Sequence, residues 1–344
     1  MPETSRGIAP LNWPALVAEA IRRRKAEKMT QKEHAALASV SIPTMIAFDR
    51  GERTLSLAKA IDILRVVGLV EEISAEGAQE IFVRDAFARW RDLTKDLPKE
   101  SPGRFPHGWY RIDYALEGDI KDTELHKFPE VLRKVVVNHT GWPMFWLPHR
   151  AELAPAQVDG TIECWLPPGD KSGFDRPFYD AAHCDFWRAA PTGRVFLIRG
   201  YQEDTQETFP PGTIFDTTLP IWRIGEAFLH AAKLARQIVR EPEAAVVRLR
   251  VLYTGLQGRD LRAWANPMTV DYFGGGRSRS DEAMLEASES VAKIETDLGA
   301  CVFPLISSLF ERFGVTGISA EFIASELTKM RANRFGDDAA ALRG

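Results

Sequence analysis

The chain has 344 residues, of which 45% are hydrophobic and 27% are charged, and its formal net charge is −4. This length suits two or three domains of about 100–200 residues each, and the composition is that of a globular protein with sizeable cores. No apolar run approaches the roughly 18 residues of a membrane span, and the first residues lack the pattern of a secretory signal. The three cysteines are too few and too scattered for a disulfide framework. We therefore expect a cytoplasmic protein with no membrane partner.

The charge is distributed unevenly along the chain. Residues 1–70 contain 11 Lys and Arg against 7 Asp and Glu, a net charge of +4, whereas the remaining residues contain 33 against 41, a net charge of −8. A basic segment on an acidic body is typical of a chain in which one module contacts phosphate. A difference of this size also arises by chance, so charge alone does not indicate whether the basic segment contacts phosphate. That prediction depends on the sequence motifs.

The first 70 residues predict four short helices, each with its own start or stop signal. Proline is tolerated in a first helical turn, a Thr and a Glu three residues apart form a capping box, Ser is a natural N-cap, and Gly commonly ends a helix. The helices are expected after Trp13, after Thr30, over 42–50 and over 57–64. The residues that mark their ends are Pro14, Thr30, Glu33, Ser41, Gly51 and Gly68.

Three segments of this region match a known signature in residue identity and spacing, namely 29–33 (MTQKE), 40–41 (VS) and 49–53 (DRGER). They resemble the XRE family of Cro and lambda-type repressors. The resemblance implies a lambda-repressor-like, all-α helix-turn-helix domain over residues 1–72 that binds double-stranded DNA. In that family the second helix of the motif enters the major groove by its N-terminal residues. Carried over, Gln31 contacts a phosphate, and the residues that face base edges are Ser41, Ile42, Pro43, Thr44 and Ala47.

Basic residues surround this motif and favour contact with DNA. They are Arg22, Arg23, Arg24, Lys25, Lys28, Lys32 and Arg50. The motif also departs from the family, because His34 replaces a buried Leu, Ser39 replaces the turn glycine, and Ile42, Pro43 and Ala47 lack the groups that read guanine or adenine. The departures predict modest direct readout that depends on phosphate contacts and DNA shape. The alternative is a degenerate motif kept for protein contacts.

A single helix is expected to follow this domain. Val83, Phe87, Trp90 and Leu97 form an apolar seam after the cap Ser74. The stretch 99–106 contains Pro and Gly and is typical of a linker, so residues 73–104 are interpreted as a connecting helix and linker. The seam predicts an inter-domain or dimer helix, or else an amphipathic helix packed on its own domain.

The remaining residues alternate between helical and strand patterns and predict an α+β or α/β sensor or effector domain over 105–275. Residues 274–278 are interpreted as a hinge, and 276–344 as a helical dimerisation and tail region. The expected helices span 122–139, 222–240, 281–298, 303–313 and 320–333, and the expected strands span 161–166, 194–201 and 246–253.

Seven of the nine tryptophans lie between positions 109 and 264, and several stand beside ionisable residues. Aromatic walls with a few polar anchors are typical of small-molecule pockets, and arginine beside indole favours a flat or cationic guest. The predicted walls are Trp142, Trp146, Trp165 and Trp187, and the predicted anchors are His149, Arg150, His183, Asp185, Arg199 and Tyr201. The alternative is a large core with surface ion pairs.

No motif in this part demands catalysis, a cofactor or a metal. His149, Cys164, His183, Cys184 and Asp185 lack metal-binding spacing, and the chain contains no phosphate-binding loop signature. The runs around Trp142, His183 and Ile198 are similar to a domain that follows AlbA- or Schlafen-like modules in bacterial proteins, a similarity that implies no catalytic residue.

Together these features predict a multidomain α+β protein that is a transcriptional regulator, and a repressor in particular. It would act as a homodimer on DNA, respond to a small-molecule effector and have no enzymatic activity. Two alternatives stay open. The chain could be a stress or phage-defence effector with an enzymatic C-terminal domain, or a structural adaptor.

Overall fold

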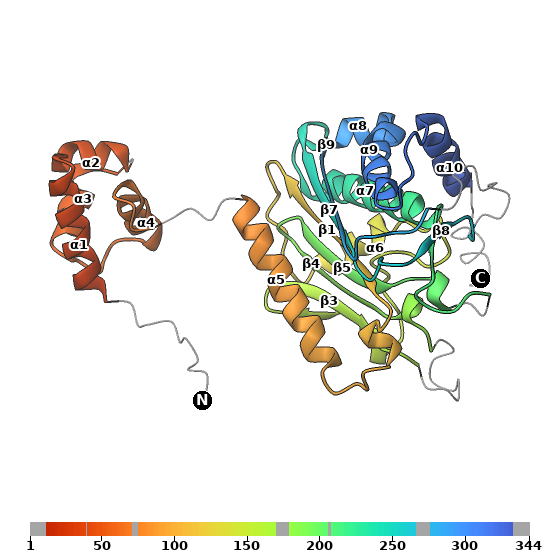
Figure 1. Ribbon diagram of the computed structural model, residues 1–344. Coiled ribbons are helices and arrows are strands. Elements are labelled where there is room, and N and C mark those ends of the chain that lie inside the picture. Colours follow the sequence, from red (N-terminus) through yellow and green to blue (C-terminus); the bar gives the residue numbers. More distant parts are fainter. Residues whose placement is uncertain are drawn as a thin grey trace. The chain divides into compact units, whose positions relative to one another are not determined.

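The computed structural model describes residues 12–38, 40–70, 75–169, 179–205, 208–265 and 276–332. The chain divides into two compact units, residues 1–77 and residues 78–344; Figure 1 shows their elements. The predicted turn residue Ser39, the predicted cap Ser74 and the hinge glycines Gly274 and Gly275 lie outside the described residues.

The N-terminal unit is all-helical, as expected. Its helices are α1 (Trp13–Ala26), α2 (Gln31–Leu37), α3 (Ile42–Asp49) and α4 (Leu57–Val66). The capping box of Thr30 and Glu33 is confirmed, and so is Ser41 as the N-cap of α3. Gly51 and Gly68 follow α3 and α4 with φ of +70° and +65°, a conformation that glycine adopts without steric cost.

Apolar residues from all four helices form the core of this unit, with Val17, Met45, Phe48 and Ile63 at its centre. His34 is fully buried where an apolar residue was expected, and its Nε2 lies 2.8 Å from the carbonyl oxygen of Ile63. One ring nitrogen is therefore satisfied, which offsets part of the cost of burying a polar ring, whereas His34 Nδ1 has no hydrogen-bond partner among the described residues.

The second unit is built on an antiparallel seven-stranded sheet in the order β2-β3-β4-β5-β1-β7-β9. Its strands are β1 (Trp109–Glu117), β2 (Ala156–Val158), β3 (Thr161–Leu166), β4 (Asp185–Ala190), β5 (Arg194–Gly200), β7 (Val246–Tyr253) and β9 (Ala283–Ser290). Two short strands, β6 (Ile214–Asp216) and β8 (Asp260–Arg262), form a separate parallel pair. The predicted strands at β3 and β7 are confirmed, and β5 ends one residue earlier than expected.

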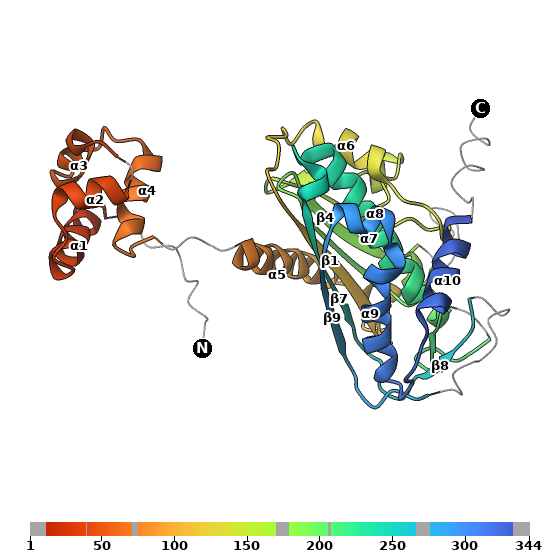
Figure 2. The same ribbon diagram turned by 90° about the horizontal axis from the view of Figure 1, so that it is seen from above.

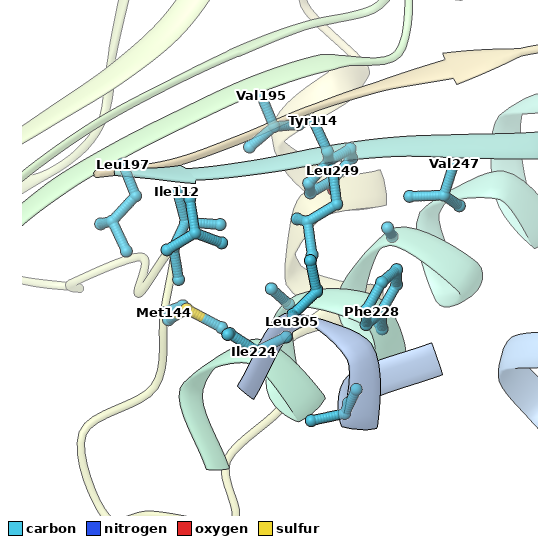
Figure 3. Packing of buried hydrophobic residues seen from close by; sticks show 14 of the residues in the cluster. Ile112, Tyr114, Met144, Val195, Leu197, Ile224, Phe228, Val247, Leu249 and Leu305 are labelled. Atoms are coloured by element: carbon cyan, nitrogen blue, oxygen red, sulfur yellow. The ribbon is translucent and has the colours of Figure 1, made fainter. Parts of the chain in front are cut away.

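One face of the sheet carries the main core. It packs against α6 (Phe128–Val135), α7 (Leu219–Ile238), α8 (Val291–Thr296), α9 (Leu298–Glu311) and α10 (Ala320–Ala332). Figure 3 shows Ile112 and Leu249 of the sheet facing Phe228 of α7 and Leu305 of α9. Because α8–α10 bury their apolar faces here, residues 276–332 belong to this core. They do not form a separate region as was predicted, and a role in dimerisation stays a prediction.

The other face of the sheet carries α5 (Ala75–Thr94), which Figure 2 shows opposite α7–α10. Val83 and Trp90 pack on Phe186 and Ile198 of the sheet, together with Phe105. The apolar seam of α5 therefore packs against the sheet of its own unit. Of the two interpretations of this helix, an amphipathic helix packed on its own domain is correct, and an inter-domain or dimer helix is not. The stretch 99–106 continues this packing, since Phe105 is 3% exposed, so 73–104 is not a free connector.

The helix expected over 281–298 is wrong in its first half, where the structure has strand β9. Ala283 and Leu285 are buried and Met284 and Glu286 are exposed, which is the two-residue alternation of a strand with one solvated face. Pairing with β7 stabilises this segment as a strand and outweighs its helical propensity. The helix expected over 122–139 is shorter, because α6 begins at Phe128 and Pro129 occupies its first turn.

No helix among the described residues is long and apolar enough to cross a membrane.

Candidate functional site

The N-terminal end of α3 presents an exposed surface. Ser41, Ile42 and Pro43 are exposed, with 45% of Ile42 accessible, whereas Met45 and Phe48 are buried. The Ser41 hydroxyl accepts a hydrogen bond from the Thr44 backbone N–H at 3.3 Å, which holds this first turn in place. Of the residues predicted to face base edges, the first three are accessible, and Thr44 and Ala47 are half-buried.

Three of the predicted DNA contacts form hydrogen bonds inside the unit. Arg24 is 8% exposed and donates to both carboxylate oxygens of Asp49, at 3.0 and 2.7 Å. Gln31 donates to the same carboxylate at 2.5 Å. Arg23 donates to the carbonyl oxygens of Val67 and Gly68 at the end of α4, at 3.2 and 2.7 Å. The prediction of Arg24 as a DNA contact is corrected, because its buried donors hold α1 to α3. Arg23 and Gln31 are half-buried, and their contact with DNA stays a prediction.

Other cations of this unit remain exposed. Arg22 pairs with Glu19, and Arg50 lies 3.9 Å from Glu52. Five exposed cations form no ion pair with the described residues. They are Lys25, Lys28, Lys32, Arg53 and Lys59. This set includes three of the basic residues that were predicted to favour contact with DNA, Lys25, Lys28 and Lys32.

The predicted tryptophan pocket is not formed as a single cavity. Trp142 and Trp146 lie with ring centroids 5.0 Å apart, and Trp187 is fully buried in the main core, with its Nε1 donating to the Trp146 carbonyl at 2.9 Å. Trp165 packs on the opposite face of the sheet, toward α5. Trp187 pairs with Cys164 across the sheet, and Trp165 is the next residue of that strand. Because consecutive strand residues point to opposite faces, Trp165 cannot share a cavity with Trp187. His149 and Arg150, two predicted anchors, are exposed.

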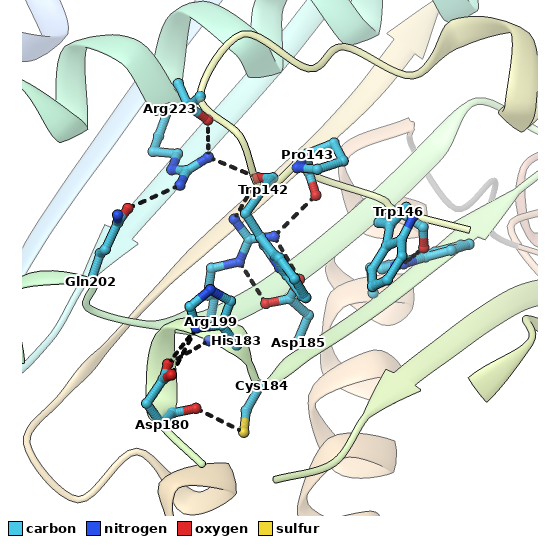
Figure 4. Close-up of polar contacts among 12 residues, drawn as sticks. Trp142, Pro143, Trp146, Asp180, His183, Cys184, Asp185, Arg199, Gln202 and Arg223 are labelled. Carbon is cyan, nitrogen blue, oxygen red and sulfur yellow. Dashed lines mark hydrogen bonds and ion pairs between the residues drawn. The ribbon is translucent and has the colours of Figure 1, made fainter. Parts of the chain in front are cut away.

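The structure does bring four of the predicted anchors to one end of the sheet. Arg199 is buried and donates to both carboxylate oxygens of Asp185, at 2.5 and 2.6 Å. Asp185 also accepts from Trp142 Nε1 at 2.9 Å, and the His183 ring lies 4.6 Å from Trp142. Figure 4 shows Arg199 reaching past Asp185 to the Pro143 carbonyl, at 3.2 Å. Tyr201, the fourth anchor, lies beyond Arg199 on the same face.

A second arginine, Arg223 of α7, extends this cluster. It lies 3.2 Å from Glu226 and donates to the Trp142 carbonyl at 3.0 Å and to Gln202 at 3.3 Å. Glu226 in turn accepts from the His139 backbone N–H at 2.9 Å. The segment around Trp142 is therefore held against both the sheet and α7 by buried charge-assisted hydrogen bonds.

These groups border a small cavity of about 30 Å³. Its aromatic walls include Tyr110, Tyr201, Phe215 and Tyr253, and its polar lining includes Arg199, Gln202, Glu203 and Arg223. Tyr201 donates to the Thr254 carbonyl at 2.8 Å, whereas the buried Tyr253 hydroxyl has no hydrogen-bond partner among the described residues. A buried hydroxyl without a partner is costly, so this cavity is a candidate binding site in the second unit.

Glu203 is the one acidic side chain in the lining of this cavity. Burial raises the pKa of its carboxyl to about 8, and the neighbouring Asp216 adds to the shift while Arg259 opposes it. Glu203 Oε1 accepts from the Asp216 backbone N–H at 3.1 Å. The carboxyl is therefore mainly protonated at neutral pH.

This shift predicts that Glu203 makes stability depend on pH. The folded protein holds the Glu203 proton between pH 4.5, the usual value, and about 8, and the unfolded chain does not. Stability should therefore fall as pH rises through this window, by on the order of a few kcal/mol. Urea unfolding at pH 5 and pH 8 should show a smaller decline for Glu203→Gln than for the wild type. Glu130→Gln, an exposed control, should keep the wild-type decline, and equal declines in all three proteins would contradict the assignment.

Glu203, Gln202, Arg223, Glu226 and Tyr253 were not predicted as site residues. Arg223 and Glu226 carried a usable signal, because two opposite charges three residues apart stand on the otherwise apolar face of α7. No group of three or more His, Cys, Asp or Glu side chains among the described residues is arranged to hold a metal ion.

Comparison of the chain with protein-family models, with curated proteins and with solved structures finds no match.

Proposed function

We propose that this protein is a transcriptional regulator that binds double-stranded DNA through its N-terminal unit. The observation that carries the proposal is the exposed N-terminal turn of α3, where Ser41, Ile42 and Pro43 are accessible above a buried Met45 and Phe48. A helix that presents its first turn in this way has the geometry with which recognition helices enter the major groove. The resemblance of the capping box and of residues 49–53 to XRE repressors supports the same function.

The side chains expected to face the bases offer few hydrogen-bonding groups. Ile42 and Pro43 offer apolar atoms that fit a thymine methyl group, and Ser41 and Thr44 offer hydroxyls. Their hydroxyls already lie 2.9 Å from each other. Most of the affinity would therefore come from phosphate contacts of the exposed cations, with DNA shape adding to sequence preference.

The proposal predicts that exposed cations of the N-terminal unit set the salt dependence of DNA binding. We expect Lys32→Ala combined with Arg53→Ala to weaken binding to duplexes of unrelated sequence about equally, by roughly tenfold or more. The slope of log K against log salt should become less steep by about 2, since each lost phosphate contact releases about one counterion less. Fluorescence anisotropy of labelled duplexes at several salt concentrations measures both quantities.

The matched control for this experiment removes two exposed cations from the second unit, by Lys99→Ala and Lys134→Ala. Both positions are exposed and neither forms an ion pair with the described residues. This variant should bind DNA as the wild type does. Equal losses in the two double variants would show that net charge alone matters, and unchanged binding in both would refute the DNA-binding proposal.

A dimer is part of the proposal, because two recognition helices one DNA turn apart raise the affinity that one small helix provides. The apolar faces of α5 and α8–α10 are buried within their own unit, so the dimer contact must use another surface. Light scattering of the complex should give two chains per duplex.

We further propose that the second unit senses a small molecule, with the cavity beside Glu203 in place of the predicted tryptophan pocket. The buried cluster of Arg199, Asp185 and Arg223 around this cavity supports the proposal. An extensive buried polar network is costly unless each member is satisfied, and the unpartnered Tyr253 hydroxyl points to a missing polar partner.

A further inference from the structure

The acidic groups around this cavity outnumber the basic ones. Three buried arginines lie in or beside its lining, and each has a carboxylate of its own. The pairs are Arg199 with Asp185 at 2.5 Å, Arg223 with Glu226 at 3.2 Å, and Arg259 with Asp204 at 2.6 Å. Two further buried carboxyls, Glu203 and Asp216, have no arginine or lysine partner among the described residues. The cluster therefore holds more acidic than basic groups.

Asp216 is satisfied by the backbone. One of its oxygens accepts from the N–H groups of Thr218 and Leu219 at the start of α7, at 2.7 and 2.6 Å. The other accepts from Trp264 and Ala265, both at 2.7 Å. Four N–H groups and a helix N-terminus stabilise a carboxylate without any cation. The acidic group that lacks compensation is therefore Glu203.

Glu203 faces a lining of aromatic rings. Tyr110 and Tyr253 lie with ring centroids 6.1 Å apart, and Phe215 lies 5.4 Å from Tyr253. The Tyr253 side chain is 3% exposed, and its hydroxyl oxygen is free to accept a hydrogen bond from an occupant of the cavity. Aromatic faces attract cations electrostatically. The lining thus offers a carboxyl, a phenol oxygen and ring faces.

The arginines of the lining do not make this an anion site. Arg199 donates to Asp185 and to the carbonyls of Trp142 and Pro143. Arg223 donates to the Trp142 carbonyl, to Glu226 and to Gln202. Because these donors are used by backbone and side-chain oxygens, an anion in the cavity would have to break existing bonds.

We propose that the cavity binds a small primary ammonium ion, held by the Glu203 carboxylate, the Tyr253 hydroxyl oxygen and the surrounding aromatic rings. An ammonium group has three N–H donors and no acceptor, so it complements the ionised Glu203 carboxylate and the hydroxyl oxygen of Tyr253, which has no partner among the described residues. A cavity of about 30 Å³ admits an ion of a few heavy atoms. The inference rests on the sensing role proposed for the second unit, and it names the class of ligand.

Binding of the cation should be coupled to proton release. The ammonium ion binds the ionised carboxylate, which is a minor species at pH 7 and the major one at pH 9 because the pKa of Glu203 is about 8. A primary alkylammonium keeps its own proton over most of this range. The apparent dissociation constant should therefore fall about tenfold between pH 7 and pH 9, in proportion to the ionised fraction. Asp204, Asp216 and Arg259 also act on Glu203, and Glu203→Gln separates its contribution from theirs.

The test is calorimetric titration of the full chain, without DNA, with methylammonium chloride at pH 7 and pH 9. We expect saturable binding that is about tenfold tighter at pH 9. Glu203→Gln should abolish binding, whereas Glu130→Gln, an exposed position, should leave it unchanged. Sodium chloride, sodium acetate and acetamide serve as the ionic-strength, anion and neutral probes, and none of them should bind.

Tyr253→Phe provides an independent readout, because a structural role and a binding role predict opposite results. Removing a buried hydroxyl that has no partner should leave the ligand-free protein as stable or more stable, yet methylammonium binding should weaken by about tenfold. Loss of stability with unchanged binding would overturn the role of Tyr253.

Absence of methylammonium binding in the wild type, or saturable binding of acetate or acetamide, would overturn the proposal. DNA binding is measured separately on the same preparation. A chain that binds DNA but no ammonium ion refutes only this inference, and one that binds the ammonium ion but no DNA refutes the regulator function and leaves the site intact.

Discussion

Arg24→Ala is expected to destabilise the N-terminal unit by roughly 3 kcal/mol. The Arg24 side chain is 9% exposed and holds α1 to α3 through both oxygens of Asp49, and its Nη1 lies 3.6 Å from the Met45 sulfur. Without it the Asp49 carboxylate, 16% exposed, keeps Gln31 as a partner but loses its countercharge. Hydrogen–deuterium exchange of the full chain should show faster exchange throughout α1 and α3.

The neighbouring Arg22→Ala is the matched control. Arg22 is 68% exposed and pairs with Glu19 on the helix surface, so its loss should cost far less stability than the loss of Arg24. Replacing both partners, by Arg24→Met with Asp49→Leu, should recover much of the lost protection, because no charge is left buried. Similar exchange in Arg24→Ala and Arg22→Ala would refute the structural role of Arg24.

The structural role of Arg23 and Arg24 limits which variants can test DNA binding. An alanine substitution of all three arginines, Arg22, Arg23 and Arg24, would lose DNA binding through loss of structure, because Arg23 and Arg24 hold helices together. Variants at Lys32 and Arg53 avoid this problem, since neither side chain forms an ion pair with the described residues.

Asp185→Ala is expected to destabilise the second unit by roughly 3–5 kcal/mol. Asp185 is fully buried, and it accepts two hydrogen bonds from Arg199 and one from Trp142. Its removal leaves the Arg199 guanidinium buried without a countercharge. Eight of the nine tryptophans lie in residues 78–344, so urea unfolding followed by tryptophan fluorescence reports mainly on this unit.

Asp119→Ala is the control, since Asp119 is 68% exposed and lies 3.0 Å from Arg240. It makes the same chemical change at a surface ion pair, so its effect should stay below about 1 kcal/mol. If Asp185→Ala cost no more than this control, the buried pair would not be what holds the Trp142 segment against the sheet.

The sequence by itself determined the features that depend on a few neighbouring residues. The capping box at Thr30, the N-cap at Ser41 and the glycines that end α3 and α4 act within one helical turn, so local chemistry is sufficient. Strands β3 and β7 were predicted because β-branched and aromatic residues are concentrated there. The alternation along β7 also held in the structure.

Only the tertiary structure decided which polar residues meet. Arg24 and Arg199 resemble any exposed cation in the sequence, and it is the approach of Asp49 and Asp185 from distant positions that buries them. Strand β9 was expected as a helix because its pairing partner β7 lies about 40 residues away, and a strand is stabilised by its neighbours rather than by its own residues. The cavity beside Glu203 likewise exists only because segments from both sides of the core converge at one end of the sheet.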